Sequence, residues 1–564
     1  MRAAPAELLI TGQIATLAGE QGLGWVEAAA IRGGRIVAAG SVAEVESACG
    51  SSTRRWELAP DQAAMPGMTD AHIHLMMLAR ARDEVDLSAA PDLDGCLRQI
   101  EDAHHRRLAA GDSEGWLLGH GWHPARIGGW PDAALLAQVA PGRPVALWAH
   151  DHHSRWISPT ALERAGIDER TNDPAGGVVR RGESGWPTGI LHETAAALVN
   201  EAIPEPDPMA LERGLMEVAS ELAALGVVAC HDPGELDTQP GLGRGQRLYR
   251  RLAREGRLPL RVHASIRDYE LGEAVEMGLH SGDRVAPDVT GDALAALRAD
   301  RYAMGWLKLF SDGSLGSRSA ALLAPYSDSR DRPPTGGPSG MLLHTPAELA
   351  RQLGRAAAAG ISSQVHAIGD AAVRLALDLL AELPRLPLMA RIEHAQLIDP
   401  KDVPRFGALG VAASVQPVHL RTDAPIERLA WDDRARHSFP LAGLLGGGAL
   451  IPFGTDAPVE PIDPWPGIAV ALCRRDPFVP TDDPLGPEHA IDLPTALRAA
   501  CGHPALVAGE SDRGRLVAGQ RADLVIVPAE ALSEGVDPAT LAATRPLTTL
   551  IDGEIVYRSD DLSG

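Results

Sequence analysis

The stretch MPGMTDAHIHL, residues 65–75, carries two histidines, His72 and His74, that lie two positions apart. In a β-strand, side chains at i and i+2 point to the same face, so both imidazoles would lie side by side. Two imidazoles on one face can bind the same metal ion. The alternative is a pair of unrelated histidines on an exposed strand edge. A lone His-x-His is a weak signal, so a metal site requires further ligands elsewhere in the chain.

The two ends of the chain have the pattern of an all-β unit. Residues 1–62 and 505–564 contain short apolar runs broken by the turn signals Gly33-Gly34 and Asp552-Gly553. Small β segments at opposite ends of a chain often pair with each other. We therefore expect one composite β-sandwich domain built from residues 1–62 and 505–564.

Between these ends, residues 63–504 alternate apolar runs with segments of helix length. The first run leads into His72, and the others lie at 227–232, 258–266, 305–313, 361–370, 390–398, 410–417 and 449–459. This alternation predicts parallel β-strands joined by helices that close into a ring. The expected fold class is α/β, a (β/α)8 TIM-like barrel.

A long segment at about 76–215 interrupts this rhythm after the first strand. It is rich in Trp, Gly, Pro and His. Long insertions beyond the carboxyl end of a barrel strand usually shape the active site, so we expect an inserted substrate-pocket subdomain. Four of its tryptophans are expected either to line an apolar pocket or to form the core of the insertion: Trp122, Trp130, Trp156 and Trp186.

Polar residues stand at the ends of several apolar runs. Lys308 lies within WLKLF, His366 within QVHAIGD, His394 within IEHAQ and Asp456 within GTDAP. Each has a structural alternative, such as a buried histidine bonded to a carbonyl or a turn-forming aspartate. Burying such groups costs free energy unless they are paired or ligated, and all would lie at the mouth of the barrel, where barrel enzymes act.

Lys308 is one of only two lysines in the chain, and the other is Lys401. All remaining basic side chains are arginines. This usage favours a role for Lys308 that an arginine cannot fill, such as the chemistry of a nucleophilic amine. The alternative is a lysine whose ammonium group reaches past the strand to water.

The composition restricts the kind of partner. The chain has 564 residues, a hydrophobic fraction of 45% and a formal net charge of −23. Nucleic acids and anionic membranes bind basic faces, so we expect neither as partner. Five scattered cysteines without C-x-x-C spacing favour a reducing compartment, and no signal-peptide pattern or membrane-length apolar run is present. We expect a cytoplasmic protein that acts on a small molecule, with a homodimer as one candidate assembly.

The order His-x-His, Lys, His, His, Asp along the strands resembles the metal-dependent amidohydrolases. More narrowly, the chain is similar to amidohydrolase family 3, the group of YtcJ-like proteins and N-substituted formamide deformylases. The resemblance covers nearly the whole chain and rests on MPGMTDAHIHL, HDHHSRWISPTAL, DPAGGVVRRGESGWPTGILHETA, WLKLFSDGSLGSRSAAL, QVHAIGD, IEHAQ, FGTDAPV and GRLVAGQRADLVIV.

The resemblance implies that four histidines are metal ligands: His72, His74, His366 and His394. It makes Lys308 a carboxylated bridge between two metals and Asp456 both a ligand and the general base. Imidazole donors favour Zn²⁺, as one or two ions, over Mg²⁺ or Ca²⁺. We also expect four residues to contact the substrate: His153, Trp122, Asp312 and Arg318.

The expected activity is hydrolysis of a C–N bond in an amide or N-substituted formamide. It would use metal-activated hydroxide, with Asp456 as the proton shuttle and Lys308 as the second catalytic residue. One alternative keeps the scaffold and changes the substrate to a carbamate, cyclic imide or lactone, or makes the protein a deaminase. An alternative of another class is a barrel that has lost catalysis and acts in binding or assembly.

Overall fold

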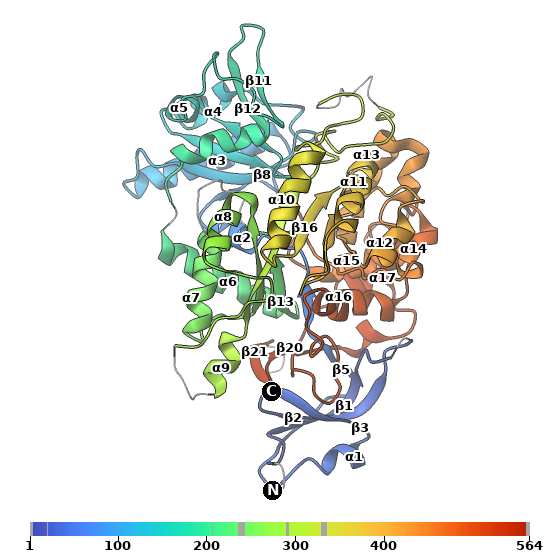
Figure 1. Cartoon of the computed structure of the whole chain (residues 1–564). Coiled ribbons are helices and arrows are strands. Elements are labelled where there is room, and N and C mark those ends of the chain that lie inside the picture. The colour runs from blue at the N-terminus through green and yellow to red at the C-terminus, as the bar shows by residue number, and fades with distance from the viewer. Residues whose placement is uncertain are drawn as a thin grey trace.

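The computed structural model describes residues 4–19, 21–205, 207–234, 243–288, 293–328 and 336–559. Three β-sheets organise these residues. Figure 1 shows a sheet built from an insertion at the top, a barrel in the middle and a sheet formed by both ends of the chain at the bottom. None of the helices in these ranges is long and apolar enough to cross a membrane.

The barrel contains a seven-stranded parallel sheet in which each strand pairs with the next one of the barrel along the chain. Its strands are β6 (Met68–Asp70), β13 (Val227–Asp232), β14 (Arg261–Arg267), β15 (Tyr302–Phe310), β16 (Ser363–Ala367), β17 (Arg391–His394) and β18 (Ala412–Ser414). The larger helices between and after them are α6 (Pro208–Ala224), α7 (Arg244–Arg254), α10 (Pro346–Ala358), α11 (Asp370–Ala381), α12 (Val403–Leu409), α13 (Leu420–Trp431), α15 (Pro464–Cys473) and α16 (Leu493–Val507).

Residues 449–456 take the place of the eighth strand. On one side the backbone of this segment bonds to β18 and Val415, through Ala413 N to Leu450 O, Val415 N to Pro452 O and Gly454 N to Val415 O. On the other side it bonds to the end of β6, through Ala71 N to Phe453 O and Asp456 N to His72 O. The ladder is irregular because Pro452 has no N–H to donate. These bonds close the ring, so the expected TIM-like barrel is found.

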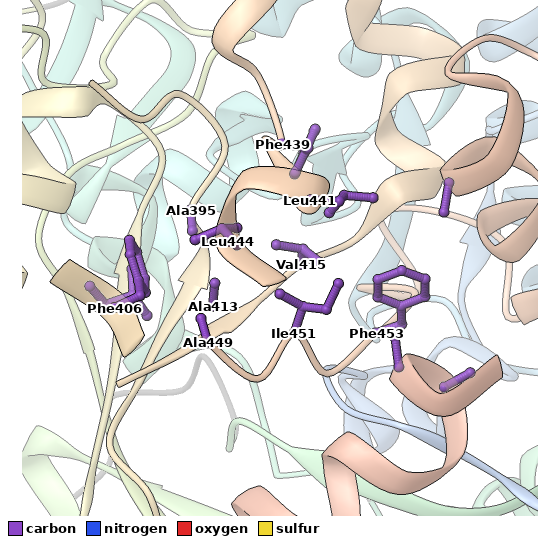
Figure 2. Close-up of a cluster of buried hydrophobic side chains, with 14 of the residues drawn as sticks. Ala395, Phe406, Ala413, Val415, Phe439, Leu441, Leu444, Ala449, Ile451 and Phe453 are labelled. Carbon is purple, nitrogen blue, oxygen red and sulfur yellow. The ribbon is translucent and has the colours of Figure 1, made fainter. Parts of the chain in front are cut away.

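An apolar core supports this irregular segment. Figure 2 shows Ile451 and Phe453 among the buried side chains of Phe406 in α12, Val415 after β18 and Leu444 in α14 (Leu441–Gly446). Burying an aliphatic or aromatic side chain of this size contributes about 1.5–3 kcal/mol. Packing therefore holds the backbone ahead of Asp456 where regular strand bonds do not.

The insertion forms a six-stranded sheet of its own between β6 and β13. Its spatial order is β11 (Gly177–Arg181), β12 (Pro187–Glu193), β10 (Ser154–Ile157), β9 (Val145–Ala149), β8 (Leu117–Trp122) and β7 (Val85–Asp86). Its helices are α3 (Leu93–Ala109), α4 (Ala133–Val139) and α5 (Pro159–Arg164), and α2 (Leu75–Ala81) leads into it from the barrel. The expected boundaries at about 76 and 215 stay a prediction.

Strands from both ends of the chain share one eight-stranded sheet. Its order is β21 (Glu554–Arg558), β20 (Thr548–Ile551), β19 (Leu524–Pro528), β5 (Gln62–Pro66), β1 (Leu8–Ala15), β2 (Trp25–Arg32) and β3 (Arg35–Gly40), with β4 (Arg54–Glu57) beside β1. The two ends meet where β19 runs antiparallel to β5. The division into two stacked sheets stays a prediction, and residues 1–3 and 560–564 of the expected domain lie outside the described ranges.

Candidate metal centre

A cavity of about 1850 Å³ opens at the carboxyl ends of the barrel strands, and residues of the inserted sheet line part of it. All six residues predicted as ligands line this cavity: His72, His74, Lys308, His366, His394 and Asp456. They come from strand regions that are far apart in the sequence. The closed barrel is therefore what brings them together.

His72 and His74 follow β6 rather than lie in it, which corrects the expected strand geometry. The strand ends at Asp70, whose Oδ1 accepts hydrogen bonds from the backbone N–H of His72 (3.1 Å) and Thr455 (3.0 Å). His74 N then donates to Ala457 O at 2.9 Å. The two imidazole centroids are 5.5 Å apart. The histidines are neighbours because the turn is tied to the eighth strand segment, not because of the i, i+2 rule.

The carboxylate of Asp456 lies at the centre of four imidazoles. Its Oδ1 is 3.3 Å from Nε2 of His72 and 3.4 Å from Nε2 of His74. Its Oδ2 is 3.4 Å from Nε2 of His419 and 3.9 Å from Nδ1 of His394. Two groups with metal-ligand spacing therefore share Asp456, one with His72 and His74 and one with His394 and His419. All five residues are buried.

The protonation states of His72 and Asp456 fit a bound cation. Burial lowers the pKa of His72 to about 4, so its ring is neutral at physiological pH. Its Nδ1 is hydrogen-bonded to the carboxylate of Glu393, which leaves the lone pair on Nε2. Burial opposes ionisation of Asp456, but the imidazoles around it hold its pKa well below the ordinary value. A lone pair that faces a carboxylate oxygen is repelled unless a cation lies between them, so the donor set fits a divalent metal.

Lys308 lies on β15, beside Gln364 of β16 in the sheet register. Its side chain is buried, and burial lowers its pKa to about 7. The ammonium nitrogen is 4.8 Å from the ring centroid of Phe310. Within the described ranges no hydrogen bond or ion pair to this nitrogen is found. A substantial fraction of Lys308 is therefore a neutral amine near pH 7.

His366 is in the cavity but outside both groups that share Asp456. Its Nε2 is 3.1 Å from the carbonyl oxygen of Gly313. Its ring centroid is 4.6 Å from that of His394 and 5.8 Å from that of His153. If the Nε2–H donates to Gly313, the lone pair sits on Nδ1. Its role as a ligand stays a prediction.

The structure adds two residues that the sequence interpretation missed. Glu393 is fully buried on β17 and accepts hydrogen bonds from His72 and Arg391. The available signal was a pair of charged residues, Arg391 and Glu393, two apart in the stretch RIEH, which forms a buried strand. His419 lies after β18, between Asp456 and Glu460. Burial disfavours its charge, but these two carboxylates raise its pKa well above the ordinary value.

Two of the expected substrate contacts line the cavity. His153 donates from Nδ1 to the Glu193 carboxylate at 2.7 Å. Burial works against the charge of His153, but Glu193 raises its pKa to about 9, so the ring is cationic at neutral pH. Arg318 also lines the cavity, and its guanidinium pairs with Asp328 at 2.6 Å.

The other two lie behind the cavity wall, which corrects the expectation. Trp122 belongs to the core of the inserted sheet and donates its Nε1–H to Leu147 O at 3.0 Å. Asp312 is fully buried and accepts three backbone N–H bonds, from Ala321, Ile368 and Gly369. Of the four tryptophans, Trp130 lines the cavity, Trp122 and Trp156 are core residues, and Trp186 is 57% exposed.

Curated proteins similar to this chain span nearly its whole length. YtcJ of Bacillus subtilis, described as a putative amidohydrolase, is 29% identical over 94% of this chain and 96% of its own. The N-substituted formamide deformylase of Arthrobacter pascens is 26% identical over 94% and 95%. The protein LONG AFTER FAR-RED 3 of Arabidopsis thaliana is 29% identical over 98% and 92%.

Two solved structures share the fold over the whole length. An uncharacterised metal-dependent hydrolase of Pyrococcus horikoshii OT3 has a TM-score of 0.71 and 25% identity, over 97% of this chain and 99% of that one. A second, from Pyrococcus furiosus, has a TM-score of 0.69 and 25% identity, over 94% and 99%. The sequence pattern of the amidohydrolase family matches residues 59–557. This protein therefore belongs to the amidohydrolase family.

Proposed function

We propose that this metal-dependent hydrolase cleaves the C–N bond of an amide or N-substituted formamide. The observation that supports it most is the arrangement of His72 and His74, whose Nε2 atoms both lie within 3.4 Å of one oxygen of Asp456. A carboxylate held against imidazoles in a large cavity can serve both as a ligand and as a proton acceptor. The name of the Arthrobacter relative supports the formamide as substrate.

The metal would be held by the residues around Asp456. Those of the two groups are His72, His74, His394, His419 and Asp456. We propose Zn²⁺, since neutral imidazole and carboxylate are its usual ligands, with Lys308 and His366 completing the site. When bound, the ion lowers the pKa of water from 15.7 to about 7 and polarises the carbonyl group under attack.

Side chains of the protein would then transfer the protons and orient the reacting groups. Asp456 takes a proton from the attacking water, holds it on a carboxylate oxygen and returns it to the leaving nitrogen. Glu393 fixes the tautomer of His72 and so directs its Nε2 toward the site. His153, cationic beside Glu193, donates a hydrogen bond into the cavity and can bind an oxygen of the substrate.

The test combines metal content with a substrate panel. The purified protein is loaded with Zn²⁺ and assayed against N-substituted formamides, acetamides, carbamates, cyclic imides, lactones and aminopurines. We expect turnover of formamides or amides, loss of activity on chelation and its return with Zn²⁺ or another divalent ion. Full activity in protein shown by elemental analysis to be metal-free would overturn the proposal.

Variants separate an enzyme from a binding protein on the same scaffold. His74→Ala should lose both metal and turnover. His105→Ala, on the exposed face of α3, should keep both. A protein that binds metal tightly at His74 but turns over no member of the panel would favour the binding or assembly alternative.

A further inference from the structure

We propose that the substrate carries a carboxylate and that Arg267 is the residue that binds it. This inference rests on the proposed hydrolysis of an amide and goes beyond it by naming the charge of the substrate. The class of substrate is an anionic amide, such as an N-formyl or N-acyl amino acid.

Arg267 is the last residue of β14 and lines the cavity. Its Nε and Nη1 atoms are buried, and neither has a hydrogen-bond partner. Across the part of the chain that the structure describes, no carboxylate lies within ion-pair distance of its guanidinium. The nearby carboxylate of Glu270 accepts from the backbone N–H of Arg267 at 2.7 Å rather than from the side chain. Withdrawing a guanidinium from water without an anion is costly, so an external anion is the partner that this group lacks.

A shortage of acidic residues does not explain the missing partner. The chain has 75 Asp and Glu against 52 Lys and Arg. Three other arginines that line the same cavity have acceptors, and Arg180 is exposed to water. Arg318 pairs with Asp328 at 2.6 Å, and Arg421 pairs with an aspartate at 3.2 Å. Arg126 donates to the carbonyl of Ser88 at 2.8 Å. Among the described arginines that line the cavity, Arg267 therefore has buried N–H groups without an acceptor, and these groups can bind a ligand.

Packing fixes Arg267 close to the metal centre. Its guanidinium carbon lies 4.5 Å from the ring centroid of Phe310, and the same ring lies 4.8 Å from the imidazole of His366. In the sheet register Arg267 is paired with Lys308, on strands that run about 4.8 Å apart. An anion bound by Arg267 would therefore lie beside the metal centre, so one small substrate can reach both.

The chemistry of the guanidinium selects the anion. Its planar N–H groups match the two oxygens of a carboxylate, and stacking on an aromatic ring holds the plane in place. Buried, charge-assisted hydrogen bonds of this kind discriminate strongly against a neutral analogue, which leaves the charge unpaired. A carboxamide in place of the carboxylate is therefore the matched neutral probe.

A carboxylated Lys308 is an alternative anionic partner for Arg267. If Lys308 is carboxylated, its carbamate is itself an anion next to Arg267 in the register. Arg267 would then hold the modified lysine rather than the substrate. The two roles give different results when Arg267 is replaced. If Arg267 holds the modified lysine, its loss lowers activity on every substrate equally and removes the mass of the carboxyl group from the protein.

The experiment compares Zn²⁺-loaded wild type, Arg267→Met and the control Arg126→Met, which changes an exposed arginine of the same cavity. The substrates are N-formylphenylalanine and N-formylphenylalanine amide, each as both enantiomers. For Arg267→Met we expect kcat/KM on the acid to fall roughly 10- to 100-fold, mainly through KM, and on the amide to change by less than about 3-fold. Arg126→Met should leave both values unchanged, and Arg267→Lys should recover part of the preference for the acid.

An equal loss on the acid and the amide, together with loss of the carboxyl mass from Lys308, would overturn the inference in favour of a lysine partner. No loss on the acid would also overturn it.

A binding measurement keeps the inference separate from the proposed activity. If the wild type hydrolyses none of these compounds, thermal shift and calorimetry with phenylacetate and phenylacetamide decide the matter. Tighter binding of phenylacetate that Arg267→Met abolishes supports the anion site while the amide substrate fails. Phenylacetate binding that survives in Arg267→Met shows that the carboxylate binds the metal alone and overturns the inference.

Discussion

Nε2 of His72 and Oδ1 of Asp456 lie 3.3 Å apart, and the backbone N–H of Asp456 donates to the carbonyl of His72 at 2.7 Å. The first strand region and the eighth therefore meet through both main chain and side chain. Closure of the barrel and assembly of the metal centre are the same structural event. A change on either side of this junction should affect the site before it affects the remaining sheet.

Asp456→Asn tests the proton shuttle. Asparagine keeps the shape of the side chain but is not a base, and general acid–base catalysis contributes about 10²- to 10⁴-fold. We expect kcat to fall by about that factor while the circular dichroism spectrum stays that of the wild type. Metal content measured on the same sample shows how much of the loss comes from the ligand role.

The control for this substitution is Asp86→Asn, since Asp86 also lines the cavity but its side chain is 64% exposed. It should keep full activity. An Asp456→Asn protein with unchanged kcat would remove Asp456 from the mechanism.

Gly454→Ala tests the close approach of the eighth strand segment to His72. A Cβ at position 454 would lie 2.5 Å from the backbone nitrogen and 2.8 Å from the Cβ of His72, closer than atoms can pack. The turn that carries His72 has to shift, so we expect metal affinity to fall about 10- to 100-fold, as for loss of a supporting contact. Titration with Zn²⁺ measures it.

Gly446→Ala is the matched control, because a Cβ there meets nothing within 4 Å. It should leave metal affinity as it is. Equal affinities for all three proteins would show that the junction tolerates the shift.

The sequence predicted the barrel because its strands are apolar runs at regular helix-length spacing, and that pattern is local. It did not predict where the first strand stops. Asp70 ends it by accepting hydrogen bonds from Thr455. Burial raises the pKa of Asp70 to about 7, although these hydrogen bonds act to lower it. A partner so far along the chain leaves no trace in the periodicity. The conclusion that His72 and His74 are neighbours was reached from strand geometry that the structure does not have.

Within the site, the sequence indicated residues at strand ends better than residues in loops. His419 follows a short strand inside the stretch QPVHL, which has no distinctive spacing, and was missed. Among the tryptophans, composition alone could not separate Trp130, which lines the cavity, from Trp122, which packs in the core. Which face of the inserted sheet a ring occupies depends on packing that only the fold specifies.

Glu427 predicts how stability depends on pH. Its carboxyl group is buried on α13, and burial, with Asp423 nearby, raises its pKa from 4.5 to about 8. Between these values the folded protein binds a proton that the unfolded chain does not hold. Its contribution to stability is therefore fully present below about pH 4.5 and is lost as the pH rises to about 8, by at most ~1.4 kcal/mol per pH unit.

Glu427→Gln mimics the protonated acid and can still accept the hydrogen bond that Gln396 donates at 2.7 Å. The variant should gain stability over the wild type between pH 6 and 8, and the gain should grow with pH. Thermal midpoints measured across this range give the difference. Glu101→Gln, at an exposed position of α3, should follow the wild type at every pH. Parallel curves for wild type and Glu427→Gln would show that Glu427 does not take up a proton on folding.

Lys308 carries the most demanding prediction, that its amine is carboxylated. A pKa of about 7 leaves much of the amine neutral, and the neutral amine is the form that reacts with CO₂. The product replaces a buried positive charge by an oxygen ligand for the metal. An arginine cannot form it and stays charged at every physiological pH. Lys308→Arg should therefore lose activity and metal, although the two residues look interchangeable.

Lys308→Ala separates the carboxylate from the rest of the side chain. It leaves space beside the site, so a short carboxylic acid or bicarbonate in the buffer should restore part of the activity. Lys401→Ala changes the other lysine, which is exposed, and should behave as the wild type with or without these additives. Intact mass measured without acid, or electron density, should show the added carboxyl group in the wild type. A bare ammonium in fully active protein would refute carboxylation, and Lys308 would then be a charge partner of Asp456 or of the substrate.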